Sequence, residues 1–141
     1  MTTPGEVVVL DTSVAVALLM STHEAHGAVK AALGGHQPVL AAHSLVETYS
    51  VLTRLPGDAR ARPADVVTAI DSNFGHTAVL SVETQGQLHE IFAQAGVQGG
   101  AVYDGIVALT ALDNGLVLLT RDRRALGAYA ALGVNVRLIE S

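Results

Sequence analysis

Four acidic residues occupy positions from which a carboxylate could do chemistry. Asp11 directly follows a short apolar run, and Asp122 follows another such run by two residues. Glu47 and Asp104 lie in segments with helical spacing. If these carboxylates converge, they offer a set of oxygen ligands to a hard divalent cation; if they do not, each has an ordinary structural role. Their separations of 36, 57 and 18 residues do not show which alternative applies.

Asp11 and Asp122 are expected where strands end and helices begin. In open α/β sheets, ligands bind at the carboxyl ends of the strands. A helix N-terminus also carries partial positive charge, which favours a carboxylate. The alternative is that each aspartate only caps its helix, because Asp is a preferred N-cap residue.

Glu47 belongs to a helical segment with two different stripes. The apolar stripe is expected to consist of Leu45, Tyr49, Leu52 and Leu55. The opposite stripe is polar and consists of His43, Glu47, Ser50 and Arg54. Periodicity alone favours a solvated face for this polar stripe. Because His43 lies on the same stripe, it would be next to any site that includes Glu47.

Asp104 stands out because its neighbours are apolar or small. The stretch from Gly99 to Leu109 reads GGAVYDGIVAL and predicts a buried helix. A carboxylate in such a helix is costly unless it is paired or binds a metal. The alternative is an aspartate in the first turn of the helix that faces solvent or accepts hydrogen bonds from backbone amides.

Short apolar runs alternate with helical segments along the whole chain. Strands are expected at Val7–Leu10, Pro38–Ala41, Ala78–Val82, Leu116–Thr120 and Val134–Ile139. Helices are expected at Thr12–Met20, His23–Leu33, His43–Leu55, Pro63–Phe74, Glu83–Ala95, Ala101–Asn114 and Asp122–Leu132. This alternation predicts one α/β domain over residues 1–141, with three α/β/α layers and a central parallel sheet of about five strands.

The composition limits the class of protein. Half of the 141 residues are hydrophobic and 15% are charged, as in a folded globule. The absence of cysteine excludes disulfides and is compatible with a cytoplasmic location. Residues Met1–Glu6 lack a basic signal-like region, and the apolar run Val14–Met20 is too short to span a bilayer, so we expect a soluble, unprocessed chain with no membrane contact. The net charge of −5 counts against nucleic-acid binding unless the acids hold metal.

The four acidic residues fall in short motifs that together resemble the PIN domain of VapC-type ribonucleases. The motifs read VLDTS from Val9 to Ser13, LVETY from Leu45 to Tyr49, VYDGI from Val102 to Ile106 and LTRD from Leu119 to Asp122. The segment VETYSVLTRLP, from Val46 to Pro56, is also similar to VapC-type sequences. Each motif alone is unspecific, but four occur in the order of the family over nearly the whole chain.

The resemblance implies a metal-dependent endoribonuclease with Mg²⁺ or Mn²⁺ as cofactor. The catalytic and metal-binding set would be Asp11, Glu47, Asp104 and Asp122, with Asp11 and Asp104 as the first choices for direct ligands. The ion would activate a water for attack on phosphorus.

Residues around this set have weaker assignments. Ser13 and Thr120 would orient the carboxylates, unless they are only a helix-start serine and a strand-end threonine. Arg121, Arg123 and Arg124 could hold an RNA backbone or form a solvated loop.

The resemblance also implies an RNA substrate, a small cognate antitoxin that masks the acidic cleft, and a homodimer. Two other functions stay open. A PIN-like module could bind RNA or protein without cutting, which a nuclease assay with and without metal would decide. A phosphoryl-transfer domain could use Asp11, but Thr12 and Ser13 supply no second aspartate, and the only lysine, Lys30, is in the wrong place for a receiver domain.

Overall fold

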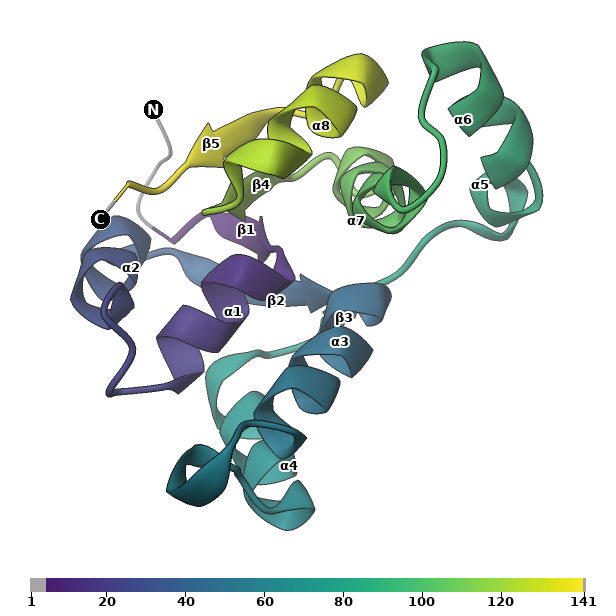
Figure 1. Ribbon diagram of the computed structural model, residues 1–141. Coiled ribbons are helices and arrows are strands. Elements are labelled where there is room, and N and C mark those ends of the chain that lie inside the picture. The colour runs from purple at the N-terminus through teal and green to yellow at the C-terminus, as the bar shows by residue number, and fades with distance from the viewer. Residues whose placement is uncertain (1–4, 141) are drawn as a thin grey trace.

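The computed structural model describes residues 5–140 and contains a sheet of five parallel strands (Figure 1). The strands are β1 (Val7–Leu10), β2 (Gln37–Ala41), β3 (Thr77–Ala78), β4 (Val117–Thr120) and β5 (Val136–Leu138). Their order is β3-β2-β1-β4-β5, and every pair of neighbours is parallel. The predicted fold class is therefore confirmed. The predicted domain span of 1–141 and the predicted unprocessed N-terminus involve residues outside the described range and stay predictions.

Helices connect the strands and cover the sheet. They are α1 (Thr12–Leu19), α2 (His26–Leu33), α3 (Ala42–Thr53), α4 (Pro63–Asn73), α5 (Val82–Gly86), α6 (Leu88–Ala95), α7 (Ala101–Asp113) and α8 (Leu126–Leu132). Two short 3-10 turns, η1 (Gly57–Ala59) and η2 (Arg123–Ala125), complete the chain. Between residues 5 and 140, no helix has both the length and the apolar character needed to cross a membrane.

Alternate residues of the central strand face opposite helical layers. Val8 and Leu10 pack in a cluster with residues of α1 to α4, whereas Val9 packs with residues of α7 and α8. All three are completely buried. This arrangement explains why the strand sequences are continuously apolar, because a strand covered on both faces has no solvent side.

The order of the strands creates a switch point next to β1. From β1 the chain continues to β2 and β3 on one side of the sheet and then crosses to β4 and β5 on the other. The connections after β1 and β4 therefore leave the sheet in opposite directions, which opens a crevice at their carboxyl ends. Asp11 follows β1 and Asp122 lies two residues beyond β4, so both stand at this crevice.

The third strand is shorter than the predicted Ala78–Val82. Its pairing with β2 ends at Ala78 and Ala41, because β2 ends there and α3 begins at the residue after Ala41. The residues after Ala78 have no strand to pair with on that side. Val82 is instead the first residue of α5 and is 87% exposed.

Other predicted elements differ at their ends. The predicted helix Glu83–Ala95 is divided at Gln87 into α5 and α6, and Gly86 lowers helix propensity at this break. The predicted helix Asp122–Leu132 begins as η2 and continues as α8. Helix α2 begins at His26, three residues later than predicted, and β5 is shorter than predicted at both ends.

Gly105 allows close packing around the first turns of α7. A Cβ atom at this position would lie 2.6 Å from Cε1 of Phe92 and 3.3 Å from Cδ1 of Leu132. A contact of 2.6 Å is too short for two carbon atoms, so a larger residue would displace α7 or its neighbours. Because Asp104 is the preceding residue, this packing also sets the position of its carboxylate.

Candidate active site

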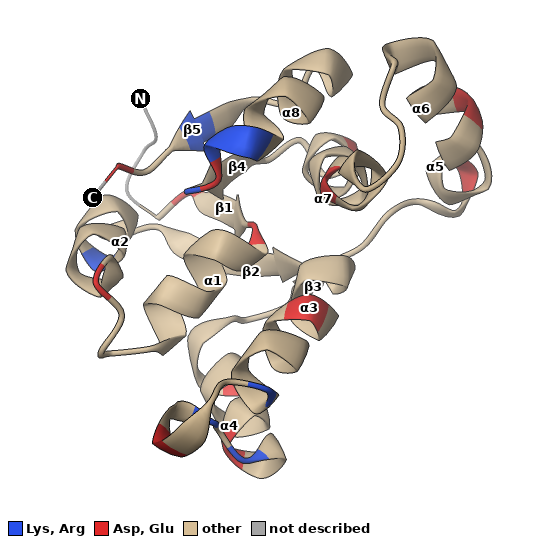
Figure 2. Cartoon of the chain, in the orientation of Figure 1, with Lys and Arg blue, Asp and Glu red and all other residues tan. Residues whose placement is uncertain are grey.

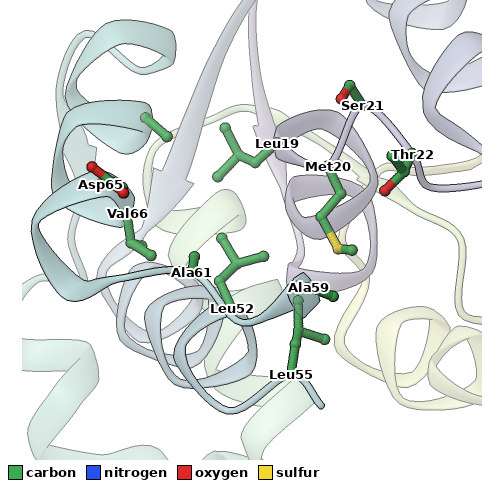
Figure 3. A pocket seen from close by; sticks show the side chains of 11 residues that line it. Leu19, Met20, Ser21, Thr22, Leu52, Leu55, Ala59, Ala61, Asp65 and Val66 are labelled. Carbon is green, nitrogen blue, oxygen red and sulfur yellow. The ribbon is translucent and has the colours of Figure 1, made fainter. Parts of the chain in front are cut away.

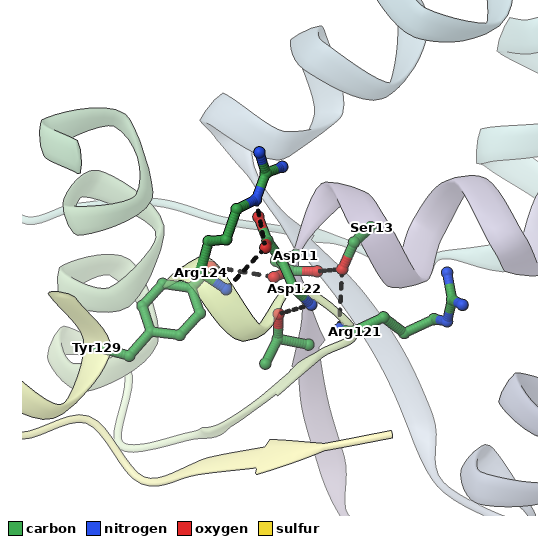
Figure 4. A network of polar contacts seen from close by, with 7 residues as sticks. Asp11, Ser13, Arg121, Asp122, Arg124 and Tyr129 are labelled. Atoms are coloured by element: carbon green, nitrogen blue, oxygen red, sulfur yellow. Dashed lines mark hydrogen bonds and ion pairs between the residues drawn. The ribbon is translucent and has the colours of Figure 1, made fainter. Parts of the chain in front are cut away.

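Asp11 lies at the centre of a hydrogen-bond network (Figure 4). The hydroxyl of Ser13 donates to its Oδ1 at 2.5 Å, and the hydroxyl of Tyr129 donates to its Oδ2 at 3.0 Å. The backbone N–H of Val14 also donates to Oδ1, at 3.2 Å, so Asp11 caps α1. Burial raises the pKa of Asp11, while hydrogen bonds from Ser13, Thr120 and Tyr129 act in the opposite direction. Hydrogen bonds therefore fix the orientation of the Asp11 carboxylate, while burial removes most of its contact with water.

Asp122 approaches from the neighbouring strand. Its backbone N–H donates to Oγ1 of Thr120, which is completely buried, and its own Oδ1 accepts from the N–H of Arg124. Oγ of Ser13 accepts from the N–H of Arg121, which ties α1 to the end of β4. Asp11 and Asp122 are therefore both helix caps, as one alternative predicted, and capping does not prevent either from facing the crevice.

One small pocket at this crevice is lined by all four predicted acidic residues. Its volume is about 60 Å³, and its walls are Asp11, Thr12, Ser13, His43, Glu47, Tyr103, Asp104, Val107, Asp122 and Tyr129. We call it the acidic pocket. Figure 2 shows acidic residues on α3, on α7 and at the end of β1, with a basic segment beside β4. The structure brings the four acids together, and their catalytic and metal-binding roles stay predictions.

Asp104 lies in the first turn of α7 and is half-buried. Burial raises its pKa, and the negative charges of Asp122, Asp11 and Glu47 raise it further, while Arg124 opposes this. The first-turn position matches the structural alternative, but the side chain lines the acidic pocket. The carboxylates of Asp122, Asp11 and Glu47 therefore lie within electrostatic reach of Asp104.

Glu47 is the most open of the set. Its side chain is 46% exposed, and its Oε2 lies 4.0 Å from Nε2 of His43. The predicted apolar stripe of α3 is confirmed for Leu52, which is buried, and for Leu45 and Leu55, which pack against the same core cluster. It is wrong for Tyr49, which is exposed. Periodicity also missed the buried Ser44 and Thr48, because small hydroxyl residues count as polar even where they are buried.

The three arginines after β4 have different contacts. Arg124 contacts Oδ1 of Asp122 at 3.4 Å through its Nε, and Arg123 forms an ion pair with Glu140. Arg121 and Arg123 line a second pocket of about 250 Å³ near the end of the chain. Their predicted contact with RNA stays a prediction.

A larger groove lies elsewhere on the protein (Figure 3). Its volume is about 310 Å³, and its mostly apolar walls come from α1, α3, α4 and the segments that connect them, and include Leu19, Leu52 and Val66. Asp65 is its only acidic lining residue. Because one carboxylate cannot form a cluster, this groove is not the site that the four acids predict.

The chemistry of the acidic pocket fits a hard divalent cation. Four carboxylates supply oxygen donors, which Mg²⁺ and Mn²⁺ prefer. Two buried polar atoms of its walls, Oγ1 of Thr12 and Nε2 of His43, have no hydrogen-bond partner within residues 5–140. In the same range, no three His, Cys, Asp or Glu side chains are grouped as a ready-made metal site. Mg²⁺ usually keeps several waters and is bound by one or two protein carboxylates.

Tyr129 is a functional candidate that the sequence interpretation missed. It is 1% exposed, and its hydroxyl finds a partner 118 positions away in Asp11. Burial and the charge of Asp11 raise the pKa of Tyr129 far above its usual range, so it stays a neutral donor. A tyrosine in the apolar segment LGAYAAL signals a buried hydroxyl that needs a partner, but not which partner.

We expect Tyr129→Phe to weaken the metal affinity and activity of the acidic pocket by about 10- to 100-fold, as loss of a group that orients a ligand does. Without this donor, the pKa of Asp11 rises further, so protons compete more strongly with metal near neutral pH. Titration with Mn²⁺ at several pH values measures the effect, and Tyr49→Phe on the exposed face of α3 is the matched control. Equal Mn²⁺ affinities in the Tyr129→Phe variant and the wild type would contradict this role.

Comparison with known proteins identifies the family. The family model of the PIN domain matches residues 8–132. The chain is 46% identical to Ribonuclease VapC27 of Mycobacterium tuberculosis over 127 residues, which are 90% of this chain and 93% of that protein. Among solved structures, FitAcB from Neisseria gonorrhoeae shares the fold with a TM-score of 0.67, at 23% identity over 92% of this chain and 95% of that one. A Mycobacterium tuberculosis member of the VapBC family of toxin-antitoxin systems, VapBC-5, has a TM-score of 0.60 at 18% identity, over 96% and 98% of the two chains. With its fold, its crevice and these matches, the chain belongs to the PIN domain family.

Proposed function

We propose that this chain is a metal-dependent endoribonuclease and the toxin of a VapBC-type toxin–antitoxin pair. The observation that carries the proposal is the acidic pocket, which gathers four carboxylates from β1, α3, α7 and the end of β4. The high identity to a ribonuclease over nearly the whole chain supports the same activity here. We further propose that residues 1–141 form a single PIN domain and that two copies form a dimer.

In this proposal the four carboxylates of the acidic pocket and the hydroxyl groups around Asp11 have defined tasks. Bound Mg²⁺ or Mn²⁺ would supply an activated water and offset charge on the phosphate. Asp11 and Asp104 would hold the ion directly, and Asp122 and Glu47 would hold it directly or through water. The hydroxyl groups of Ser13, Thr120 and Tyr129 keep the first carboxylate in one orientation.

The electrostatics link RNA binding to metal. The chain carries a net charge of −5, and the acidic pocket alone repels a phosphate. A bound divalent cation would offset two of these negative charges and would present its own positive charge to the scissile phosphate. Arg121, Arg123 and Arg124 lie beside Asp122 and are proposed to contact neighbouring phosphates of the strand.

A cognate antitoxin would inactivate the enzyme by covering this same charge. We propose that it places a basic side chain in the acidic pocket, where the side chain takes the position of the cation. A toxin–antitoxin complex that leaves the pocket open and the nuclease active would contradict this part of the proposal.

A nuclease assay on the purified chain tests the function. We expect single-stranded RNA to be cleaved internally with Mg²⁺ or Mn²⁺ and to remain intact when a chelator removes the metal. RNA that is bound but never cut, with any of these ions, would instead favour a non-cleaving binding module. Cleavage that continues in chelator would contradict the metal-dependent mechanism.

A further inference from the structure

Beside the acidic pocket, two aromatic rings form a stacked pair. His43 lies in the first turn of α3 and Tyr103 in the first turn of α7. Their ring centroids are 5.8 Å apart and their planes are inclined by 11°. This is the offset, nearly parallel arrangement that aromatic rings favour. The pair therefore connects the two helices that carry Glu47 and Asp104.

Core packing does not account for Tyr103. The residue is 57% exposed, although it directly precedes the half-buried Asp104 and both line the acidic pocket. His43 supports its ring on one side, so the ring is fixed in orientation while much of it stays open to solvent. A flat, supported and exposed aromatic surface next to a reactive pocket is suited to binding another flat, unsaturated group.

We propose that the His43–Tyr103 pair is a stacking platform for one unpaired base of the RNA strand. The proposal rests on the ribonuclease function proposed above. Unstacked bases of single-stranded RNA bind on aromatic side chains largely regardless of sequence, because every base has a π face. A base stacked on Tyr103 would bring its own backbone next to Asp104, so that the adjoining phosphate would lie at the acidic pocket.

The charge of the protein favours a source of RNA affinity other than contacts to phosphates. Nucleic-acid-binding proteins usually gain affinity by contacting phosphates with many basic residues. This chain has 8 Lys and Arg against 13 Asp and Glu. The arginines beside Asp122 are divided between ion pairs with Glu140 and Asp122 and a separate pocket. Stacking supplies binding free energy that does not depend on net charge.

The test combines variants of the ring with substrates that lack single bases. The substrate is a short single-stranded RNA spanning a site that the wild type cleaves, together with a series in which one nucleotide at a time is abasic. For the wild type, we expect kcat/KM to fall about 10- to 100-fold when one particular base is missing, mainly through KM. Tyr103→Leu should lose as much on the intact RNA and should not respond to the abasic nucleotide at that position. Tyr103→Phe keeps the ring and should behave like the wild type.

Tyr49→Leu is the matched control, because Tyr49 is an exposed tyrosine of α3 outside the acidic pocket. The proposal is overturned if no single abasic position lowers kcat/KM of the wild type. It is also overturned if the losses in kcat/KM caused by Tyr103→Leu and by the abasic nucleotide add up in the combined experiment. Either result with an active wild type leaves the ribonuclease function intact. A wild type that cleaves no RNA with Mn²⁺ would refute the proposed function itself.

Discussion

Asp11→Asn is expected to lower RNA cleavage by at least several hundred-fold without unfolding the protein. The substitution removes the charge of a first-choice metal ligand, and ion placement contributes several kcal/mol of transition-state stabilisation. Asparagine has the same shape, and its side-chain oxygen can still accept from the N–H of Val14, so the cap of α1 is kept. The loss therefore reports on chemistry and not on local structure.

The raised pKa of Asp11 strengthens this distinction. Burial disfavours the charged form of Asp11. Replacing the carboxylate by a neutral amide therefore removes an unfavourable contribution to the free energy of the folded state. We expect the metal-free variant to melt at the temperature of the wild type or above it. Single-turnover cleavage and thermal unfolding are measured on the same preparations, with Asp58→Asn in the exposed turn η1 as the control. Full activity of Asp11→Asn would refute the proposed mechanism.

The arrangement of the sheet was predictable because the strongest local signals coincide with its structure. The β1 and β4 segments are buried on both faces, so their sequences are continuously apolar and their ends are sharp. Asp11 and Asp122 were placed correctly at the carboxyl ends of these strands for the same reason. In contrast, the end of β3 depends on where its neighbour β2 ends, and no local sequence pattern contains that information.

The convergence of the acidic pocket was not predictable from local patterns. Glu47 and Asp104 lie on helices whose periodicity is compatible with a solvated face or an isolated first-turn acid. Their meeting depends on how α3 and α7 are packed around the central strands, which is a long-range property. The family resemblance supplied the expectation that periodicity could not. The bond between Tyr129 and Asp11 escaped both, because it joins residues 118 positions apart.

Asp104→Asn is expected to abolish detectable cleavage while leaving the metal-free protein equally or more stable than the wild type. Asp104 is repelled by Asp122, Asp11 and Glu47, and this repulsion adds to burial in raising its pKa. Folding brings these charges together, and the unfolded chain keeps them apart. The carboxylate is thus unfavourable for folding until a cation compensates for it.

The raised pKa fixes the sign of the pH dependence. A carboxyl group whose pKa is higher in the folded than in the unfolded state stabilises the fold fully below its unfolded pKa, whose usual value is 3.8. That contribution is lost as the pH rises from there through the raised folded value. The difference in unfolding free energy between Asp104→Asn and the wild type should therefore be small near pH 4 and should increasingly favour the variant towards pH 7.

Metal should reverse this order of stability. Mn²⁺ that binds only the folded state stabilises the wild type according to its concentration and affinity, and Asp104→Asn should lose most of that gain. Thermal unfolding with and without Mn²⁺ at both pH values measures the effect, and Asp71→Asn on the exposed face of α4 is the control. A variant that melts well below the wild type without metal would contradict this account. Asp104 would then be a buried acid that holds α7 in place, and the metal would have to rely on the other three carboxylates.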